Sequence, residues 1–365
     1  MKLPKNVLNI KKAKFITGLD IGSSKISAVT AYLEKDGQFK IVGQATKDSK
    51  GVSRGSLVNL NDAVRSVSDV LKKLKEKVPG SLGDMYVNIS GETLKGATSR
   101  GMIPISVRGR EITSPDMARC VDAASTVHLP YNREIVHRVV QKFSVDDQPW
   151  IKNPLGLYAS RVSCEVYIIT AGVNSIQNIF KCVNNAGYDV KEVVYTGIAD
   201  GSIVLNDEER VSGVLLLNIG AELTDISAFS DGALCDIEIL QIGASDFKDD
   251  FRASPAFGDI LSKVGLKFGN LKEKGHNIKS IVLTGGIIFA DGVIEHLEEK
   301  LGCPVRMGVT KEIKGNVSGL DSTRLCTAIG LIKYASKKYE NMPQNAKNLA
   351  QKVSSTVVDI FNNYF

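Results

Sequence analysis

Three short polar turns, each directly after an apolar run, hold the residues of this sequence that could do chemistry. The first consists of Asp20, Gly22, Ser23, Ser24 and Lys25. Small residues let the backbone approach an anion closely, and successive N–H groups in a turn can bind phosphate. A carboxylate such as that of Asp20 can hold a hydrated Mg²⁺. This turn is therefore predicted to bind the phosphates and the metal of a nucleoside triphosphate.

The second and third turns offer weaker versions of the same chemistry. The second is defined by its polar and small residues, which are Asn218, Gly220, Thr224 and Asp225. The third is Gly285-Gly286 after "IVLT", where the missing side chains would let an adenosine lie against the backbone. A single polar turn after a strand is most often a structural hairpin, but the order of all three turns favours nucleotide binding.

The first two turns lie in a repeated pattern of strands. Residues 15–43 and residues 214–240 each read as strand, polar turn, strand, Asp-Gly hairpin and strand. Helices are predicted between the repeats, including one over residues 61–78 capped by Asn59 or Asn61, and another that begins at Ser114 as the cap. Two copies of one unit predict a pseudo-twofold α/β molecule with a cleft between its halves.

Changes in residue composition along the chain predict the domain organisation. Residues 91–164 are rich in turns and extended pieces, which indicates a compact α+β insertion in the first half. The expected parts are a first subdomain over 14–84 and 166–205, an inserted subdomain over 85–165, a second subdomain over 206–335, a polar linker over 336–345 and a terminal helix over 346–365.

Composition excludes several classes of protein. The chain has 365 residues with 43% hydrophobic and 24% charged residues, as in a globular protein with a large core. Its six cysteines form no CxxC pair, which argues against zinc and disulfide frameworks and fits a cytoplasmic protein. The net charge of +6 comes without a nucleic-acid motif, so no nucleic-acid partner is expected.

Beyond these patterns, the sequence resembles a known family. "GLDIGSSKISAV", "LLLNIGAELTDISAF" and "IVLTGGIIFADGV" resemble the two phosphate elements and the adenosine element of the actin/Hsp70 ATPase superfamily, and the stretch from residue 85 to residue 170 resembles the inserted subdomain of FtsA, the bacterial actin homologue of cell division. The resemblance implies an actin-like (ribonuclease H-like) two-lobed fold and self-association into filaments. It also implies FtsZ and other division proteins as partners, at midcell on the cytoplasmic face of the inner membrane.

Two departures from the family pattern affect the expected binding and hydrolysis of ATP. Asn218 occupies the position of the family's Asp, and Ala221 and Glu222 replace glycines, so a carboxylate for the metal is lost and a negative charge faces the phosphate. Family members also carry a small subdomain, absent here, that closes over the adenosine and receives the FtsZ tail. We therefore expect weak binding of ATP with Mg²⁺, an absent or residual ATPase activity, and weakened contact with FtsZ.

The last twenty residues show the clearest helical periodicity in the chain. Their apolar face is predicted to contact a membrane surface through Leu349, Val353, Val357, Ile360, Phe361, Tyr364 and Phe365. Without the resemblance, packing on the body or on a partner chain is the commoner use of such a pattern. FtsA-like proteins end in a membrane-binding helix of this kind, which favours a peripheral anchor.

Three alternatives remain open at this point. A kinase or chaperone of the same fold would hydrolyse ATP, which Asn218 disfavours. A PilM-like adaptor of pilus machinery shares the first turn but generally lacks the terminal helix. A nucleotide-free division paralogue that does not bind FtsZ fits the departures.

Overall fold

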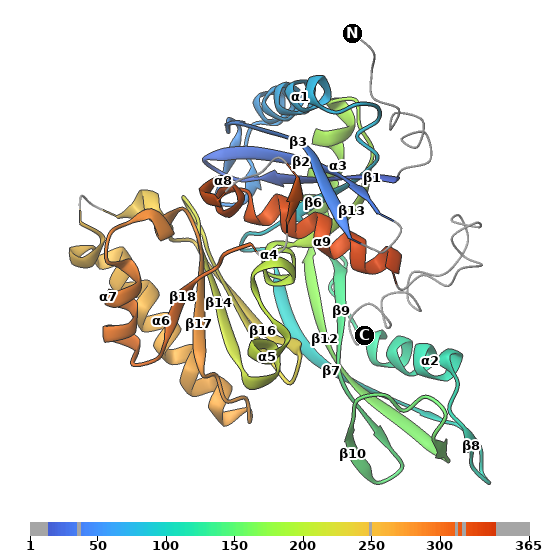
Figure 1. The fold of residues 1–365 in the computed structure, drawn as a ribbon. Helices are drawn as coiled ribbons and strands as arrows, with labels where there is room; N and C mark the ends of the chain where they lie inside the picture. Colours follow the sequence, from blue (N-terminus) through green and yellow to red (C-terminus); the bar gives the residue numbers. More distant parts are fainter. Residues whose placement is uncertain (1–13, 35–37, 248–249, 311–312, 316–318, 341–365) are drawn as a thin grey trace. The chain divides into compact units, whose positions relative to one another are not determined.

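The computed structural model describes residues 14–34, 38–247, 250–310, 313–315 and 319–340 (Figure 1). They fall into two compact units. Of the described residues, the first unit holds those within 14–89, Gln177–Val204 and Val309–Tyr339. The second unit holds those within Ser90–Ile176 and Leu205–Gly308, together with Glu340. Each unit is described by itself.

A mixed sheet forms the centre of the first unit. Its strand order is β13-β6-β1-β2-β3-β19. The strands are β1 (Lys14–Ile21), β2 (Lys25–Leu33), β3 (Phe39–Asp48), β6 (Asp84–Ile89), β13 (Val190–Tyr195) and β19 (Lys314–Gly315). β1, β2 and β3 are antiparallel neighbours, whereas β6 runs parallel to β1, and β13 runs parallel to β6.

The second unit contains a sheet of the same design, in the order β16-β15-β14-β17-β18. Its strands are β14 (Val214–Ile219), β15 (Thr224–Ser230), β16 (Ala233–Leu240), β17 (Ser280–Gly285) and β18 (Val305–Met307). The first three strands are again antiparallel, and the next two continue parallel to the first. Both sheets thus place their successive strands in the order 3-2-1-4-5, so the duplication predicted from the sequence is confirmed and the fold is actin-like.

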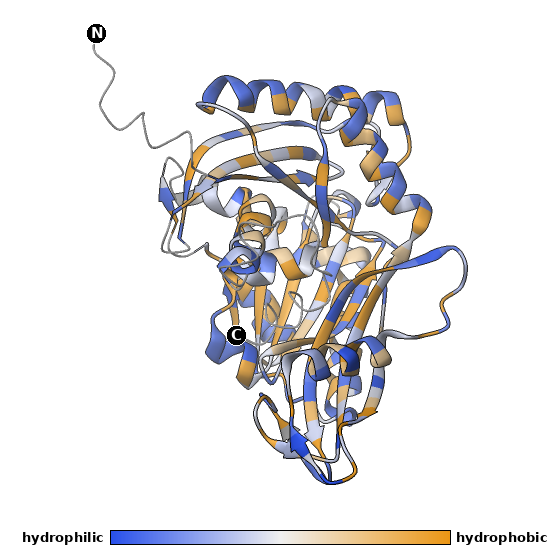
Figure 2. Ribbon diagram, turned by 90° about the vertical axis from the view of Figure 1, so that its right-hand side faces the viewer, coloured by the Kyte–Doolittle hydropathy of each residue, from blue (hydrophilic) through white to orange (hydrophobic). Residues whose placement is uncertain are grey.

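Helices accompany the sheet of the first unit. They are α1 (Leu60–Lys77), α3 (Val173–Asn185), α4 (Thr196–Val204), α8 (Gly319–Arg324) and α9 (Cys326–Glu340), with a small hairpin of β4 (Val52–Ser53) and β5 (Ser56–Leu57) before α1. Of the two caps predicted for α1, the structure has Asn59, whose side chain accepts a hydrogen bond from the Asp62 N–H. The buried face of α1 includes Val67, Leu71 and Leu74. Figure 2 shows hydrophilic and hydrophobic bands alternating along this helix at the top of the view.

The helices of the second unit include α5 (Asp207–Ser212), α6 (Pro255–Glu273) and α7 (Val293–Leu301). Between β16 and β17, the described residues form only two short 3-10 turns, Ala244–Asp246 and Phe251–Ala253, and α6. α6 packs on the sheet through Phe257, Ile260 and Val264. This matches the reduced connection expected from the sequence.

A separate four-stranded sheet, in the order β10-β9-β12-β7, lies within the inserted segment of the second unit. The elements of this segment are β7 (Lys95–Pro104), β8 (Arg110–Glu111), α2 (Ser114–Ser125), β9 (Arg133–Val145), β10 (Gln148–Ile151), β11 (Tyr158–Ala159) and β12 (Arg161–Gly172). α2 packs on this sheet, and Cys120, Phe143 and Val166 lie in the shared core. The insertion is therefore an α+β body with its own core.

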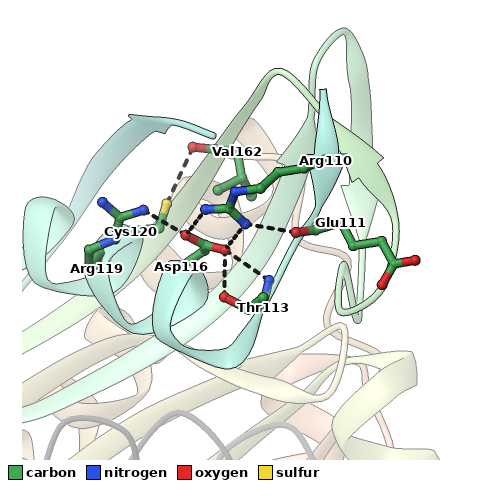
Figure 3. A network of polar contacts seen from close by, with 7 residues as sticks. All are labelled: Arg110, Glu111, Thr113, Asp116, Arg119, Cys120 and Val162. Carbon is green, nitrogen blue, oxygen red and sulfur yellow. Dashed lines mark hydrogen bonds and ion pairs between the residues drawn. The ribbon is translucent and has the colours of Figure 1, made fainter. Parts of the chain in front are cut away.

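The start of α2 differs from the prediction. Thr113 is the N-cap, one residue before Ser114, because the Asp116 carboxylate accepts hydrogen bonds from both the N–H and the hydroxyl of Thr113. Asp116 also pairs with Arg110 at 2.6 Å and Arg119 at 2.6 Å (Figure 3). These contacts, led by the Arg110 hydrogen bond, hold the pKa of the Asp116 carboxyl well below its usual range.

Three predicted boundaries differ from the structure. Residue 85, the expected start of the insertion, lies inside β6, whose pairing with β1 places it in the first sheet. α9 belongs to the first unit up to Tyr339 rather than to the second subdomain, because it packs closely against β1. Residues 336–340, the first part of the expected polar linker, belong to α9, where Ser336 and Tyr339 are buried.

No helix among the described residues is long and apolar enough to cross a membrane. The predicted terminal helix over 346–365, with its proposed membrane-contacting residues, lies outside the described residues.

Candidate nucleotide-binding site

The turn after β1 is a tight reversal held by backbone hydrogen bonding. Asp20 pairs with Ser27 across the two strands, and the Gly22 N–H donates to the Lys25 carbonyl at 3.1 Å. Within the described part of the chain, no hydrogen-bond partner is assigned to the N–H groups of Ser23 or Ser24. A turn with two open N–H groups is suited to binding an anion.

Asp20 and Lys25 place opposite charges in this turn. Burial raises the pKa of Asp20 to about 6, against the opposing effect of the Lys25 charge. The Lys25 ammonium donates to the Arg324 carbonyl at 2.5 Å, so the end of α8 fixes its position. At neutral pH the Asp20 carboxylate is mostly ionised, as a ligand of hydrated Mg²⁺ must be.

Close packing of α9 against β1 and α4 supports this turn. A Cβ on Gly18 of β1 would lie 2.0 Å from the Ala328 carbonyl oxygen, so only glycine lets α9 approach this near. Gly330 makes a similar approach to α4, where a Cβ would lie 2.2 Å from the Ala199 carbonyl oxygen. The helices and β1 are therefore locked in register beside the turn.

A buried carboxylate near the turn was missed by sequence reasoning. Asp200 of α4 is 0% exposed and accepts a hydrogen bond from the Thr327 hydroxyl at 2.8 Å. Burial, together with the nearby Asp200 and Asp20, raises the pKa of the Cys326 thiol, so the two carboxylates act on one small region. Asp200 could have been found from the sequence as a lone Asp in the otherwise apolar helix "TGIADGSIV".

The turn after β14 repeats the backbone of the first. Asn218 pairs with Asp225 across the strands, and the Gly220 N–H donates to the Leu223 carbonyl at 2.8 Å. A second segment braces this turn, because the N–H groups of Ala244 and Ser245 donate to the carbonyls of Gly220 and Ala221 at 2.8 and 2.7 Å. The bracing segment follows β16 and was not predicted.

The polar side chains of this second turn are engaged within their own unit. The Thr224 hydroxyl donates to the Ile242 carbonyl at 2.8 Å and is fully buried. The Asp225 carboxylate, 5% exposed, accepts a hydrogen bond from the Ser90 hydroxyl at 2.6 Å. These contacts support the turn, so Thr224 and Asp225 have structural roles in addition to any in ligand binding.

The two glycines after β17 differ in their surroundings. Gly285 has φ +91°, and a Cβ there would lie 2.1 Å from the Ile219 carbonyl oxygen of the paired strand. Gly286 has nothing within 4 Å of a built Cβ. Gly285 is therefore needed for the pairing of β14 with β17, whereas Gly286 leaves open space of the kind a ligand could use.

Each unit thus brings its own predicted residues together. Asp20, Gly22 and Lys25 meet in one turn, and strand pairing places Asn218 beside Thr284, next to Gly285. In the described residues, no three His, Cys, Asp or Glu side chains gather into a group that could hold a metal. The Asp20 carboxylate could supply one ligand to a hydrated Mg²⁺.

Comparison with known proteins decides the family. Residues 91–170 match the family described as the SHS2 domain inserted in FTSA. The cell division protein FtsA of Borreliella burgdorferi is 31% identical over 395 aligned positions, covering 94% of this chain and 94% of that protein. The chain belongs to the FtsA family.

Other FtsA proteins agree with this assignment. Cell division protein FtsA of Pseudomonas aeruginosa is 28% identical and covers 90% of this chain, and that of Escherichia coli is 25% identical with the same coverage. The Borreliella alignment has 395 positions, more than the 365 residues of this chain, so it must contain gaps here. This fits a shortened FtsA-family member.

Solved structures support the fold of this FtsA-family chain. The PilM-PilN type IV pilus biogenesis complex matches with a TM-score of 0.65 at 13% identity, covering 88% of this chain and 98% of that one. The ethanolamine utilization protein EutJ from Carboxydothermus hydrogenoformans matches with a TM-score of 0.50 at 14% identity, covering 87% and 88%. At these identities the likeness concerns the fold alone.

Proposed function

We propose that this protein is an FtsA-like scaffold of cell division. It self-associates into actin-like filaments and links division-ring proteins, including FtsZ, to the cytoplasmic face of the membrane at midcell. The observation that carries this proposal is the 31% identity to an FtsA over 94% of both chains. The duplicated sheets add the architecture on which actin-like assembly depends.

Each unit offers its own turn residues to a nucleotide. The proposed contacts are Asp20, with Mg²⁺, and Gly22, Ser23, Ser24 and Lys25 from the first unit, and Asn218, Gly220, Thr224, Asp225, Gly285 and Gly286 from the second. The open N–H groups of Ser23 and Ser24 and the free space at Gly286 support binding. The Asn218 amide supplies no carboxylate, so the chain is at most a weak ATPase.

The terminal segment is the proposed membrane anchor. Each large apolar side chain that is fully buried contributes about 1.5–3 kcal/mol, and half a dozen partly buried ones give reversible binding. A filament that presents many copies would bind by avidity. The anchor is therefore expected to depend on assembly.

Co-sedimentation with liposomes tests the scaffold and its anchor together. We expect the full chain to pellet with vesicles and to form filaments visible by negative-stain electron microscopy on them. A chain that stops after Asn341 should stay in the supernatant. Equal pelleting of both chains would reject the anchor, and vesicles free of filaments at micromolar protein would reject the scaffold.

The reduced connection after β16 bears on whether this protein binds FtsZ. The described residues there form two short turns and α6 rather than a subdomain. FtsZ polymers on lipid, with and without this protein, give the test. Recruitment of FtsZ to vesicles supports tethering, whereas its absence favours a division paralogue that does not bind FtsZ.

A pilus adaptor is the second candidate, favoured by the PilM-like fold that matches over 98% of that chain. The two functions separate in cells. A fluorescent fusion at midcell supports the division scaffold, and a fusion at the poles that follows pilus components supports the adaptor.

A further inference from the structure

The parallel ladder between β1 and β6 ends before the first turn. Its last pair joins Leu19 to Val87. In the second unit the matching ladder between β14 and β17 runs further, through Asn218 with Thr284 and on to Ile219. The side of β1 that faces β6 therefore needs another contact at the end that leads into the turn.

The side chain of Asn88 makes that contact. The Ile21 N–H donates a hydrogen bond to the Asn88 Oδ1 atom at 2.7 Å. Asn88 belongs to β6, directly follows the last paired residue Val87, and is 7% exposed. An amide oxygen thus continues the ladder by one hydrogen bond beyond the last backbone pair.

Asn88 is itself held by the start of α4. Its Nδ2 group donates to the Thr196 hydroxyl at 3.4 Å, and that hydroxyl donates to the Ile89 carbonyl at 3.3 Å. Thr196 is buried and is the first residue of α4, the helix that also carries Asp200. Because the amide oxygen accepts from Ile21 and the amide nitrogen donates to Thr196, both ends of the side chain are fixed.

The hydrogen bond from Ile21 acts on the turn at its first residue. Ile21 directly precedes Gly22, whose N–H closes the turn on the Lys25 carbonyl. The N–H groups of Ser23 and Ser24 follow on the same short backbone, so their direction depends on where Ile21 is held. A partly buried N–H is costly to leave without an acceptor, so a chain without this amide would have to move the end of β1.

We propose that Asn88 is a positioning residue, which fixes the turn of residues 20–25 so that its N–H groups face the phosphates of a bound nucleotide. It acts through the Ile21 N–H rather than by contact with the ligand. Thr196 supports it by holding the amide. This inference rests on the proposed nucleotide binding and adds the residue that sets the geometry of the phosphate-binding turn in the first unit.

Three variants test this role. Asn88→Ala removes the acceptor, whereas Thr196→Val removes only the hydroxyl that holds the amide. The matched control is Thr17→Val, towards the other end of β1. The Thr17 hydroxyl is 0% exposed and bonds to the Thr30 hydroxyl at 2.7 Å and to the Leu82 carbonyl at 2.6 Å. Its loss therefore removes buried hydrogen bonds of the same strand without touching the turn.

Binding is measured with a fluorescent ATP analogue and Mg²⁺, and with the corresponding adenosine analogue, which carries no phosphate. We expect Asn88→Ala to weaken binding of the ATP analogue about tenfold and to leave binding of the adenosine analogue unchanged. Thr196→Val should weaken binding of the ATP analogue about threefold, and Thr17→Val should change neither. An equal loss for both analogues in Asn88→Ala, no loss for either, or the same loss in Thr17→Val would overturn the proposal.

Hydrogen exchange of the free protein separates the positioning role from nucleotide binding. Exchange of the Gly22 N–H, which bonds to Lys25 and not to Asn88, should quicken about tenfold in Asn88→Ala and stay unchanged in Thr17→Val. If the unaltered chain binds the two analogues equally, the proposed phosphate contact fails, and exchange at Gly22 alone decides whether Asn88 positions the turn. Unchanged exchange there in Asn88→Ala contradicts the positioning role even in a chain that binds nucleotide. Should Asn88→Ala not fold, Thr196→Val gives the same two measurements with smaller expected changes.

Discussion

The turn after β1 and the turn after β14 share one backbone but differ in their side chains. In each, a glycine N–H donates to the carbonyl three residues later, at 3.1 Å for Gly22 and 2.8 Å for Gly220. In the first, the incoming strand carries the carboxylate Asp20, opposite Ser27. In the second, the incoming strand carries the amide Asn218, opposite the carboxylate Asp225.

The surroundings of the two turns also differ. Asp20 is half-buried, which raises its pKa, and no partner is assigned among the described residues to the N–H groups of Ser23 and Ser24. Around the second turn, Asp225 is paired with Ser90, and residues 244–245 brace the backbone. The comparison indicates that the first turn has kept features suited to a ligand, while the second has become a structural support.

The largest effect is expected where the support of the second turn is broken. Gly285→Ala puts a Cβ 2.1 Å from the Ile219 carbonyl oxygen at a φ of +91°, so the variant should lose about 3 kcal/mol of unfolding free energy. Gly286→Ala, with open space around it, should lose under about 1 kcal/mol. Urea denaturation gives the values, and hydrogen exchange should quicken in β14 and β17 of the first variant only. Equal losses would contradict the roles assigned to the two glycines.

The next effect tests the burial of Asp20. Its pKa of about 6 lies above the value near 4 of an unfolded Asp, so the folded state binds more protons between these values. The free energy of unfolding should therefore fall as pH rises from about 4 to about 6. Asp20→Asn removes the cost of burying the ionised carboxylate. It should raise the free energy of unfolding by about 2 kcal/mol at pH 8 and change it little at pH 4.

The mirrored substitution sharpens the comparison. Asn218→Asp places a carboxylate at the matching position of the second turn, so it should lower stability at pH 8 more than at pH 4. Denaturation curves at both pH values supply the measurement. If Asp20→Asn shows the same gain at pH 4 as at pH 8, the effect does not come from its charge.

A smaller effect is expected on nucleotide affinity. Removing the negative charge of Glu222 and restoring a carboxylate, as N218D/E222G, should strengthen binding of a fluorescent ATP analogue with Mg²⁺ by about tenfold, or 1.4 kcal/mol. Glu222→Gln alone should retain part of the gain, because it removes the charge without altering the backbone. Unchanged binding in both variants would show that the missing subdomain, rather than this turn, limits affinity.

Local patterns in the sequence predicted much of this architecture. Alternating apolar residues located both strand–turn–strand repeats, and Asn59 was one of the two predicted caps of α1. The Asp231-Gly232 turn lies between β15 and β16 as predicted, whereas Asp36-Gly37 lies outside the described residues. Long-range packing decided the rest. That β6 pairs with β1, and that α9 packs against Gly18, depends on contacts between distant residues that no local pattern encodes.

The site was predictable to the same extent. The turn residues were visible as small and polar types between apolar runs, whereas Asp200 comes from a different element and joins the region only through the packing of α4 against α9. The brace by Ala244 and Ser245 uses backbone N–H groups, which carry no residue-type signal.

The smallest expected effect is the difference in unfolding free energy between alanine substitutions at Gly22 and at Gly220. A Cβ on Gly22 would lie 2.9 Å from the Lys25 carbonyl oxygen, whereas a Cβ on Gly220 would lie 3.3 Å from that of Leu223. Replacing glycine by alanine also restricts the unfolded chain, which favours folding by about 0.4–1 kcal/mol. The mild crowding at Gly220 should cancel this gain, so Gly220→Ala should leave the unfolding free energy nearly unchanged.

Gly22→Ala should lose about 1 kcal/mol, since the backbone of the tighter turn has to shift. Urea denaturation of both variants under one set of conditions gives the difference. Because the shift would also move the N–H groups of Ser23 and Ser24, Gly22→Ala should weaken binding of the ATP analogue more than Gly220→Ala does. A larger loss of affinity in Gly220→Ala would reverse the assignment of the ligand-binding turn to the first repeat.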